Sequence, residues 1–227
     1  MIRAVIVDVN DTLCMTEAGS FDLVNDVLAR MGRPPMSRAV HKATWGEVLL
    51  DAMPRRSPGV DLHRFAELFP AAHQEYLADG RLDVIPPENL AALDKLVLAG
   101  RTVLLLTSRA EAEIEHMLAP DHVLAGRVTG AYHQGNTRFR KPDPRAFDEL
   151  LAETGFTPGE CVYVGDSPGD AVAAGGAGLR FIACLQSGVR RLDEFDPSLV
   201  TAAIEVFPDL PAAVDQLDAV KGAAGKV

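Results

Sequence analysis

Four short runs of apolar residues recur along the 227-residue chain, and polar residues follow the end of each run. The runs are rich in Val, Ile and Leu and are not interrupted by alternating polar positions. A strand buried on both faces of a parallel sheet shows this continuous pattern. The chain therefore predicts parallel strands at 4–7, 103–106, 161–164 and 181–185, with a fifth, less apolar candidate at 202–207.

Two helices between these strands can be placed from the residues at their ends. Pro87 precedes leucines at helical spacing, and Gly100 supplies the stop. Asp143 followed by Pro144 is typical of a helix start, because aspartate caps the first N–H groups and proline fits the first helical position. Gly155 is predicted to end that helix. Alternating strands and helices predict an α/β fold with a mostly parallel sheet. Ligands of such sheets bind beyond the carboxyl ends of the strands.

Residues 15–81 interrupt this alternation. Their apolar residues follow helical spacing, prolines break the segment several times, and no run there resembles a buried strand. We interpret the segment as a helical insertion after the first strand. The predicted domains are thus a discontinuous core at 1–14 and 82–227, and a small helical domain at 15–81.

Composition and charge narrow the function classes. With 48% apolar and 24% charged residues, the chain is predicted to be soluble and globular. Its net charge of −10 disfavours nucleic acid and anionic membranes as partners. The three cysteines form no CxxC pair, and no run of 18 apolar residues occurs. We expect a cytoplasmic protein without disulfides or a membrane span, either a monomer or a homodimer.

Polar side chains gather after the predicted strands, where a parallel sheet would bring them to one edge. They are Asp8, Asn10, Asp11 and Thr12 after the first strand; Thr107, Ser108 and Arg109 after the second; Lys141 before the Asp143 helix start; and Asp166, Ser167 and Asp170 after the third.

Carboxylates gathered at one edge repel one another unless a hard cation lies among them. Mg²⁺ fits, because it prefers oxygen ligands and keeps some waters. A carboxylate that the metal does not use fully can attack phosphorus, while the metal and Lys141 offset charge on the phosphoryl oxygens. Thr107 would donate a hydrogen bond to the same oxygens. The pattern thus predicts phosphoryl chemistry with Mg²⁺.

Four segments resemble, in order and spacing, the four motifs of the haloacid dehalogenase superfamily. They are residues 8–13 (DVNDTL), 103–108 (VLLLTS), 140–144 (RKPDP) and 164–170 (VGDSPGD). The resemblance covers nearly the whole chain and points to the phosphoglycolate phosphatase-like members, which have a type 1 helical cap. It implies a Rossmann-like sheet with helices on both faces. It also implies that the insertion at 15–81 is the cap that closes over the site and selects the substrate.

The resemblance further implies roles for single residues. Asp8 would be the nucleophile and a metal ligand, and the Asp166 carboxylate and the backbone carbonyl of Asn10 would bind the metal too. Asp170 would bind the metal or lie close behind it. Ser108 and Arg109 are candidate substrate contacts. The implied function is Mg²⁺-dependent hydrolysis of a small phosphorylated or otherwise anionic substrate through an aspartyl-phosphate.

The sequence departs from the family pattern at Asn10. Phosphatases of the family carry a second aspartate there, which protonates the leaving oxygen and later activates water. Asparagine cannot exchange that proton, and a positioned acid/base typically contributes ~10²–10⁴-fold. The adjacent Asp11 is expected to point elsewhere. We therefore expect Asn10 to orient the leaving group or water, and activity to favour good leaving groups.

Three alternatives stay open. Enzymes that cleave phosphonates change this residue too and use a cap lysine, for which Lys42 is the candidate. Carbon–halogen cleavage is disfavoured, because dehalogenases lack the acidic residues of the fourth motif. A catalytically weak relative that binds a phosphorylated ligand or a partner protein is the third. A serine hydrolase at 165–169 (GDSPG) is excluded, because Pro168 has no N–H for an oxyanion and no histidine follows His133.

Overall fold

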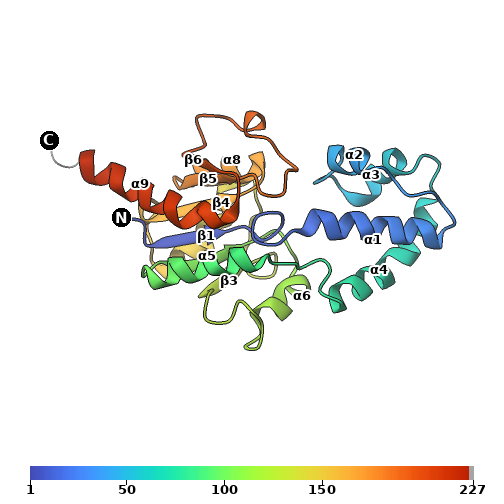
Figure 1. Ribbon diagram of the computed structural model, residues 1–227, viewed down its shortest axis with the longest axis horizontal. Helices are drawn as coiled ribbons and strands as arrows, with labels where there is room; N and C mark the ends of the chain where they lie inside the picture. The colour runs from blue at the N-terminus through green and yellow to red at the C-terminus, as the bar shows by residue number, and fades with distance from the viewer. Residues whose placement is uncertain (225–227) are drawn as a thin grey trace. The chain divides into compact units, whose positions relative to one another are not determined.

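One parallel sheet organises residues 1–13 and 85–224 in the computed structural model, which describes residues 1–224 and the side chains of 1–219. The strand order is β3-β2-β1-β4-β5-β6, and neighbouring strands run parallel throughout. Figure 1 shows β1, at the blue end of the colour scale, within this sheet. The strands are β1 (Ala4–Val7), β2 (Thr102–Leu106), β3 (Gly130–Tyr132), β4 (Cys161–Gly165), β5 (Arg180–Cys184) and β6 (Ala202–Ile204).

The four apolar runs are strands whose observed bounds lie within one residue of those predicted. The structure differs from the prediction in two places. The fifth candidate, 202–207, ends as a strand at Ile204, and a 3₁₀ helix begins at Phe207 (η5, Phe207–Asp209). Pro208 lies in that turn and has no N–H to give to a strand ladder. The edge strand β3 was not predicted, because Gly130-Ala131-Tyr132 is too short and too small to form an apolar run.

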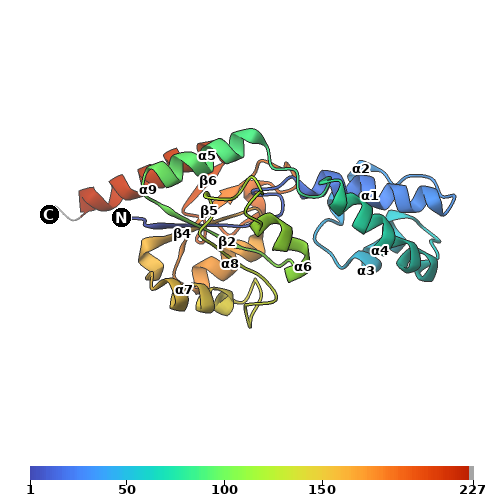
Figure 2. The same ribbon diagram turned by 90° about the horizontal axis from the view of Figure 1, so that it is seen from below.

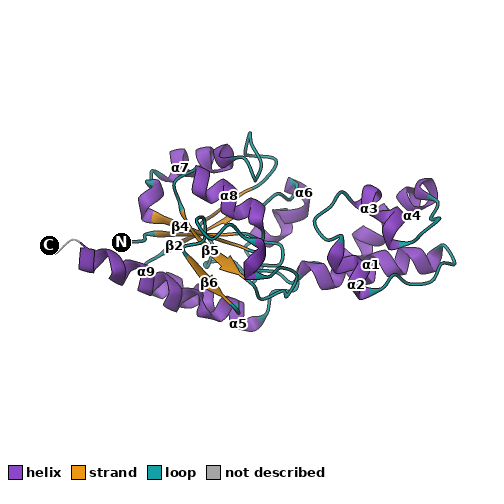
Figure 3. Cartoon of the chain, turned by 90° about the horizontal axis from the view of Figure 1, so that it is seen from above, coloured by secondary structure: helices purple, strands orange, loops and turns teal. Residues whose placement is uncertain are grey.

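Helices cover both faces of the sheet, as predicted. Figures 2 and 3 show α5 (Pro87–Leu98) and α9 (Leu210–Ala224) on one face and α7 (Asp148–Thr154) and α8 (Pro168–Gly176) on the other. The second face buries the rings of Phe147, Tyr163 and Phe181 against one another. Burying one large apolar side chain stabilises a fold by about 1.5–3 kcal/mol, so this cluster holds the central strands firmly.

The predicted helix ends are confirmed. The Asp143 side chain accepts the N–H of Arg145 at 2.9 Å and opens η2 (Pro144–Phe147), which continues into α7. That helix ends at Gly155, whose φ of 69° suits glycine. The remaining short helices of this unit are α6 (Glu111–Ile114), η1 (Glu115–Leu118), η3 (Pro158–Glu160) and η4 (Leu192–Glu194).

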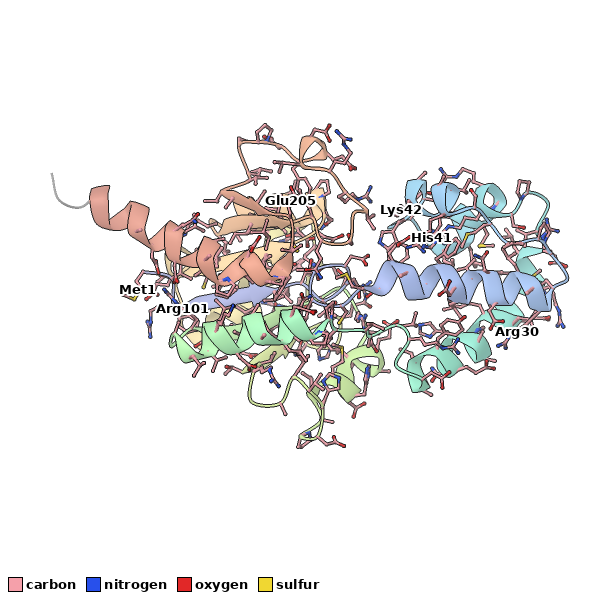
Figure 4. All side chains as sticks on the ribbon, in the orientation of Figure 1. Met1, Arg30, His41, Lys42, Arg101 and Glu205 are labelled. Atoms are coloured by element: carbon pink, nitrogen blue, oxygen red, sulfur yellow. The ribbon has the colours of Figure 1, made fainter. Side chains whose placement is uncertain are left out.

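Contacts of the chain's first residues close the end of the sheet at which the strands begin. Met1 and Arg101 lie there, where the strands begin (Figure 4). The Arg101 guanidinium and Asp218 of α9 form an ion pair at 2.7 Å, and the same aspartate accepts the N–H of Ile2 at 2.6 Å. These contacts hold α9 at the amino ends of the strands and do not involve the carboxyl ends.

The second compact unit comprises residues 14–84. Its start and end differ from the predicted 15 and 81 by one and three residues. It is helical, with a core that includes Leu28, Met53 and Phe65. A Cβ on Gly19 would lie 2.3 Å from the carbonyl oxygen of Arg81, so α1 can pack on that backbone only through glycine. The helices are α1 (Thr16–Arg30), α2 (Arg38–Ala43), α3 (Leu49–Arg56) and α4 (Leu62–Ala78).

The strand order sets the position of the site. The chain adds β2 and β3 on one side of β1, and then β4 to β6 on the other. Ligands of such sheets bind where the order reverses, outside the carboxyl ends of the strands. This point lies between β1 and β4. Among the described residues, no helix is both long enough and apolar enough to span a bilayer.

Candidate active site

Strand register brings three of the predicted residues to the same edge. Val7, the last residue of β1, stands opposite Leu105 of β2 and Val164 of β4. Asp8 follows Val7 directly, and its N–H donates to the Val164 carbonyl at 2.9 Å. Thr107 and Asp166 each come two residues after the paired position on their own strand. Parallel pairing therefore gathers one residue from each of three strand ends.

Lys141 connects the first and fourth motifs. Its Nζ donates to Asp8 Oδ1 at 2.8 Å and forms an ion pair with Asp170 Oδ1 at 2.7 Å. All three side chains are buried, with at most a tenth of each exposed. Removing charged groups from water is unfavourable, so this arrangement requires that the charges pair closely. The structure thus brings Asp8 and Asp170, from two separate segments, into direct contact with Lys141 from a third.

Tyr163 is a site residue that the sequence analysis missed. Its hydroxyl accepts from Lys141 Nζ at 2.6 Å and donates to Asp170 Oδ1 at 2.9 Å. Burial raises the pKa of this phenol well above its usual range, and the nearby Asp170 and Asp8 charges add to the effect. A buried tyrosine hydroxyl needs a polar partner. The one aromatic residue in β4, among small and aliphatic residues, was the available signal.

Asp170 is also held by the turn that follows β4. Its Oδ2 accepts from the backbone N–H of Ser167 at 3.1 Å and from Ser167 Oγ at 2.6 Å. The Asp170 N–H donates back to Ser167 Oγ at 3.2 Å, which completes a capping box at the start of α8. A Cβ on Gly165 would lie 2.7 Å from Asp170 Cγ, so glycine is needed where β4 passes this carboxylate.

Three carboxylates form a cluster that fits a hard cation. Asp8, Asp166 and Asp170 each offer an oxygen, and these oxygens lie within 4.8 Å of one another. Lys141 brings a single positive charge to this cluster. Burial, and then the negative charges of Asp8 and Asp170, raise the pKa of Asp166 well above its usual range. Such a surplus of buried negative charge is what a divalent ion would relieve, and the all-oxygen donor set suits Mg²⁺.

The ammonium group acts differently on the two carboxylates that it contacts. Burial raises the pKa of Asp8 to about 6, even though Lys141 lowers it. Burial works in the same direction on Asp170, but Lys141 and the hydrogen bonds from Ser167 and Tyr163 prevail, so its pKa is lowered. Burial by itself would lower the pKa of Lys141, but the negative charges of Asp170 and Asp8 outweigh burial and raise that pKa. At neutral pH the ammonium therefore faces two carboxylates.

The second motif supplies Thr107, Ser108 and Arg109. Thr107 is buried; its N–H donates to the Tyr132 carbonyl at 2.9 Å, and its Oγ1 accepts the N–H of Arg109 at 3.2 Å. Ser108 is exposed. The buried guanidinium of Arg109 contacts the first motif, because its Nε donates to Asn10 Oδ1 at 2.7 Å. Nothing in the sequence pattern predicted this contact.

The four motifs lie within a region of the chain that matches known proteins. A family model for haloacid dehalogenase-like hydrolases matches residues 5–184, a range that contains all four motifs. The chain belongs to this family. Phosphoglycolate phosphatase of Rhodospirillum rubrum is 27% identical to this hydrolase over 226 residues, which cover 96% of this chain and 91% of that protein. The predicted family and hydrolase class are thus confirmed, and relatives of this hydrolase are named as phosphatases.

Solved structures share the fold of this haloacid dehalogenase-like hydrolase. A putative phosphoglycolate phosphatase from Lactobacillus plantarum superposes with a TM-score of 0.72 at 21% identity, covering 92% of this chain and 98% of that one. CbbY from Rhodobacter sphaeroides, in a complex with phosphate, gives a TM-score of 0.69 at 20% identity, covering 92% and 96%. The predicted α/β Rossmann-like fold is confirmed.

Proposed function

We propose that this hydrolase removes the phosphoryl group of a small phosphorylated metabolite, with Asp8 as the nucleophile and Mg²⁺ as the cofactor. The observation that carries the proposal is the contact of Lys141 Nζ with Asp8 and Asp170 at the edge where the strand order reverses. A carboxylate with an adjacent ammonium and further acidic oxygens is suited to phosphoryl transfer. The names of the relatives suggest a substrate like phosphoglycolate, which is small and anionic.

Each proposed step uses a residue of this site. An Asp8 carboxylate oxygen forms a bond to phosphorus while the ester P–O bond breaks, and the electron pair leaves with the departing oxygen. Water then hydrolyses the aspartyl-phosphate and restores the carboxylate. Lys141 Nζ and the Thr107 hydroxyl hold the phosphoryl oxygens, and Ser108 and Arg109 are the candidate contacts for the rest of the substrate.

Four groups would hold the metal: the carboxylates of Asp8, Asp166 and Asp170, and the backbone carbonyl of Asn10. When bound, Mg²⁺ would supply positive charge that stabilises the transferring phosphoryl group. Asp8 must be ionised to attack. Burial raises its pKa only to about 6, because Lys141 works against that rise, so the carboxylate form prevails at neutral pH. We assign substrate selection and the exclusion of water to the helical unit, residues 14–84, in the role of the family's cap.

Removal of divalent metal is expected to stop hydrolysis. Without Mg²⁺ the three clustered carboxylates repel a phosphate ester, so chelation with EDTA should lower kcat/KM by at least about 100-fold. The assay measures phosphate release from p-nitrophenyl phosphate, acetyl phosphate, phosphoglycolate and a simple alkyl phosphate, with and without added Mg²⁺. Full activity in EDTA would contradict the metal assignment. Activity on a phosphonate or an organohalide alone would point to the other chemistries of this family.

Asn10→Asp is expected to speed alkyl phosphates selectively. The new carboxyl can supply the proton that a poor leaving group needs, and such groups typically contribute ~10²–10⁴-fold. Arg109 would form an ion pair with the new carboxylate and so limit its ability to give up a proton. We therefore expect a gain below that range, of at least about tenfold in kcat/KM for the alkyl phosphate. The gain for p-nitrophenyl phosphate should be small, since p-nitrophenolate leaves without a proton. Asn10→Ala serves as the control. Equal gains on both substrates would contradict this account of Asn10.

A further inference from the structure

The contact between Arg109 and Asn10 determines how the Asn10 amide is turned. Arg109 Nε lies 2.7 Å from Asn10 Oδ1. A guanidinium can only donate hydrogen bonds, whereas an asparagine amide has one accepting oxygen and one donating NH₂ group. The Asn10 oxygen must therefore face Arg109, and the NH₂ group faces away from the guanidinium. The chemistry of the donor assigns this orientation.

Arg109 is itself held firmly enough to fix a neighbour. Only 7% of the residue is exposed, and Nη1 donates to the Glu113 carbonyl at 3.3 Å and lies 3.7 Å from Met117 Sδ. Its backbone N–H donates to Thr107 Oγ1, and its carbonyl accepts the N–H of Gln134 at 3.0 Å. A side chain anchored from both its head group and its backbone has little rotamer freedom. Its hydrogen bond is therefore directional, and it restricts Asn10 in turn.

We infer that Arg109 is a positioning residue that keeps the Asn10 NH₂ group directed at the departing oxygen during phosphoryl transfer. The inference rests on the proposed function and deepens it. Asn10 follows the Asp8 nucleophile by two residues. An N–H donor stabilises negative charge as the P–O bond breaks, but it transfers no proton. The leaving group departs as an anion and takes its proton from water, so substrates with acidic leaving groups are favoured.

A double-mutant cycle tests this role. Arg109→Met removes the donor and the charge but keeps an unbranched side chain beside Met117. In the wild-type background it should lower kcat for p-nitrophenyl phosphate about tenfold, since loss of one well-placed donor typically reduces kcat by ~10²–10³-fold and a freed amide still donates part of the time. In the Asn10→Ala background it should change kcat by less than about twofold, because there is no amide left to orient. Arg109→Lys should recover part of the loss.

Two kinetic outcomes would overturn the inference. An equal loss of kcat in both backgrounds would show that Arg109 acts independently of Asn10. A rise in KM with unchanged kcat in both backgrounds would show that Arg109 acts only as a substrate contact and does not orient Asn10. Thermal denaturation of each variant separates loss of fold from loss of orientation.

A spectroscopic measurement keeps the inference separate from the proposed function. In ¹⁵N-labelled protein, the side-chain NH₂ signals of Asn10 are assigned by their loss in Asn10→Ala. We expect a rigid NH₂ group in the wild type and increased ps–ns mobility in Arg109→Met, measured by ¹⁵N relaxation. Unchanged mobility would refute the positioning role even if hydrolysis is observed. If Asp8-dependent hydrolysis is absent but mobility increases, the proposed function fails while the orientation by Arg109 stands.

Discussion

Asp8→Asn is expected to abolish hydrolysis. The amide has nearly the size of the carboxylate, and its oxygen can still accept from Lys141, but it lacks the negatively charged oxygen that attacks phosphorus. Removing an enzyme's nucleophile can lower kcat by ~10⁶-fold, so we expect a loss of at least about 10⁴-fold. Phosphate release from p-nitrophenyl phosphate under saturating Mg²⁺ measures it.

The matched control makes the same change at a surface aspartate. Asp193 lies in η4, where its carboxylate pairs with Arg191 and is 66% exposed. Asp193→Asn should therefore retain the wild-type rate. Acid quenching during turnover, followed by peptide mass analysis, should find a phosphoryl group on residues 8–13 in the wild type and none in Asp8→Asn. Phosphate release at the wild-type rate in Asp8→Asn would refute the assignment of the nucleophile.

Lys141→Met is expected to lower both activity and stability. Loss of a preorganised charge beside the reacting group typically lowers kcat by ~10²–10³-fold. The variant also leaves Asp8 and Asp170 buried without their shared ammonium, which should lower the free energy of unfolding by about 3 kcal/mol. Kinetics and urea denaturation measure the two effects. Lys95→Met, which removes an exposed lysine from α5, should change neither.

The pH profile of Lys141→Met should move in a defined direction. Burial raises the pKa of Asp8 and Lys141 lowers it, so removing the ammonium lets that pKa rise further above about 6. The acid limb of kcat/KM against pH should then shift to higher pH. In the double variant Lys141→Met with Asp170→Asn, one buried charge is gone, so stability should partly recover while activity stays low. Wild-type kinetics in Lys141→Met would exclude this lysine from the mechanism.

Local pattern was enough to predict most elements of the core. Continuous apolar runs mark β1, β2, β4 and β5, because strands buried on both faces exclude polar side chains. Asp143 with Pro144 and Gly155 marked the ends of one helical segment, since caps depend on residues adjacent in sequence. The edge strand β3 lacked such a signal. Three residues at a sheet edge are determined by pairing with β2 and not by their own composition.

The residues of the candidate site also fall into two groups, those that local pattern indicated and those that only the fold revealed. The residue types and spacing of the four motifs indicated phosphoryl chemistry and named Asp8, Lys141, Asp166 and Asp170. Tyr163 escaped notice, because a tyrosine in a buried strand is usually an apolar core residue until its hydroxyl is seen to reach a partner. The Arg109–Asn10 contact joins residues 99 positions apart, and no local pattern encodes it.

By itself, the sequence determined the family, the α/β class and the identity of the charged residues, because burial periodicity and motif chemistry are local properties. The tertiary structure alone decided which carboxylates share the Lys141 ammonium, which way the Asn10 amide faces, and that Tyr163 joins the site. Those contacts depend on strand register and on side-chain directions at the sheet edge. Both arise only when segments far apart in the chain pack together.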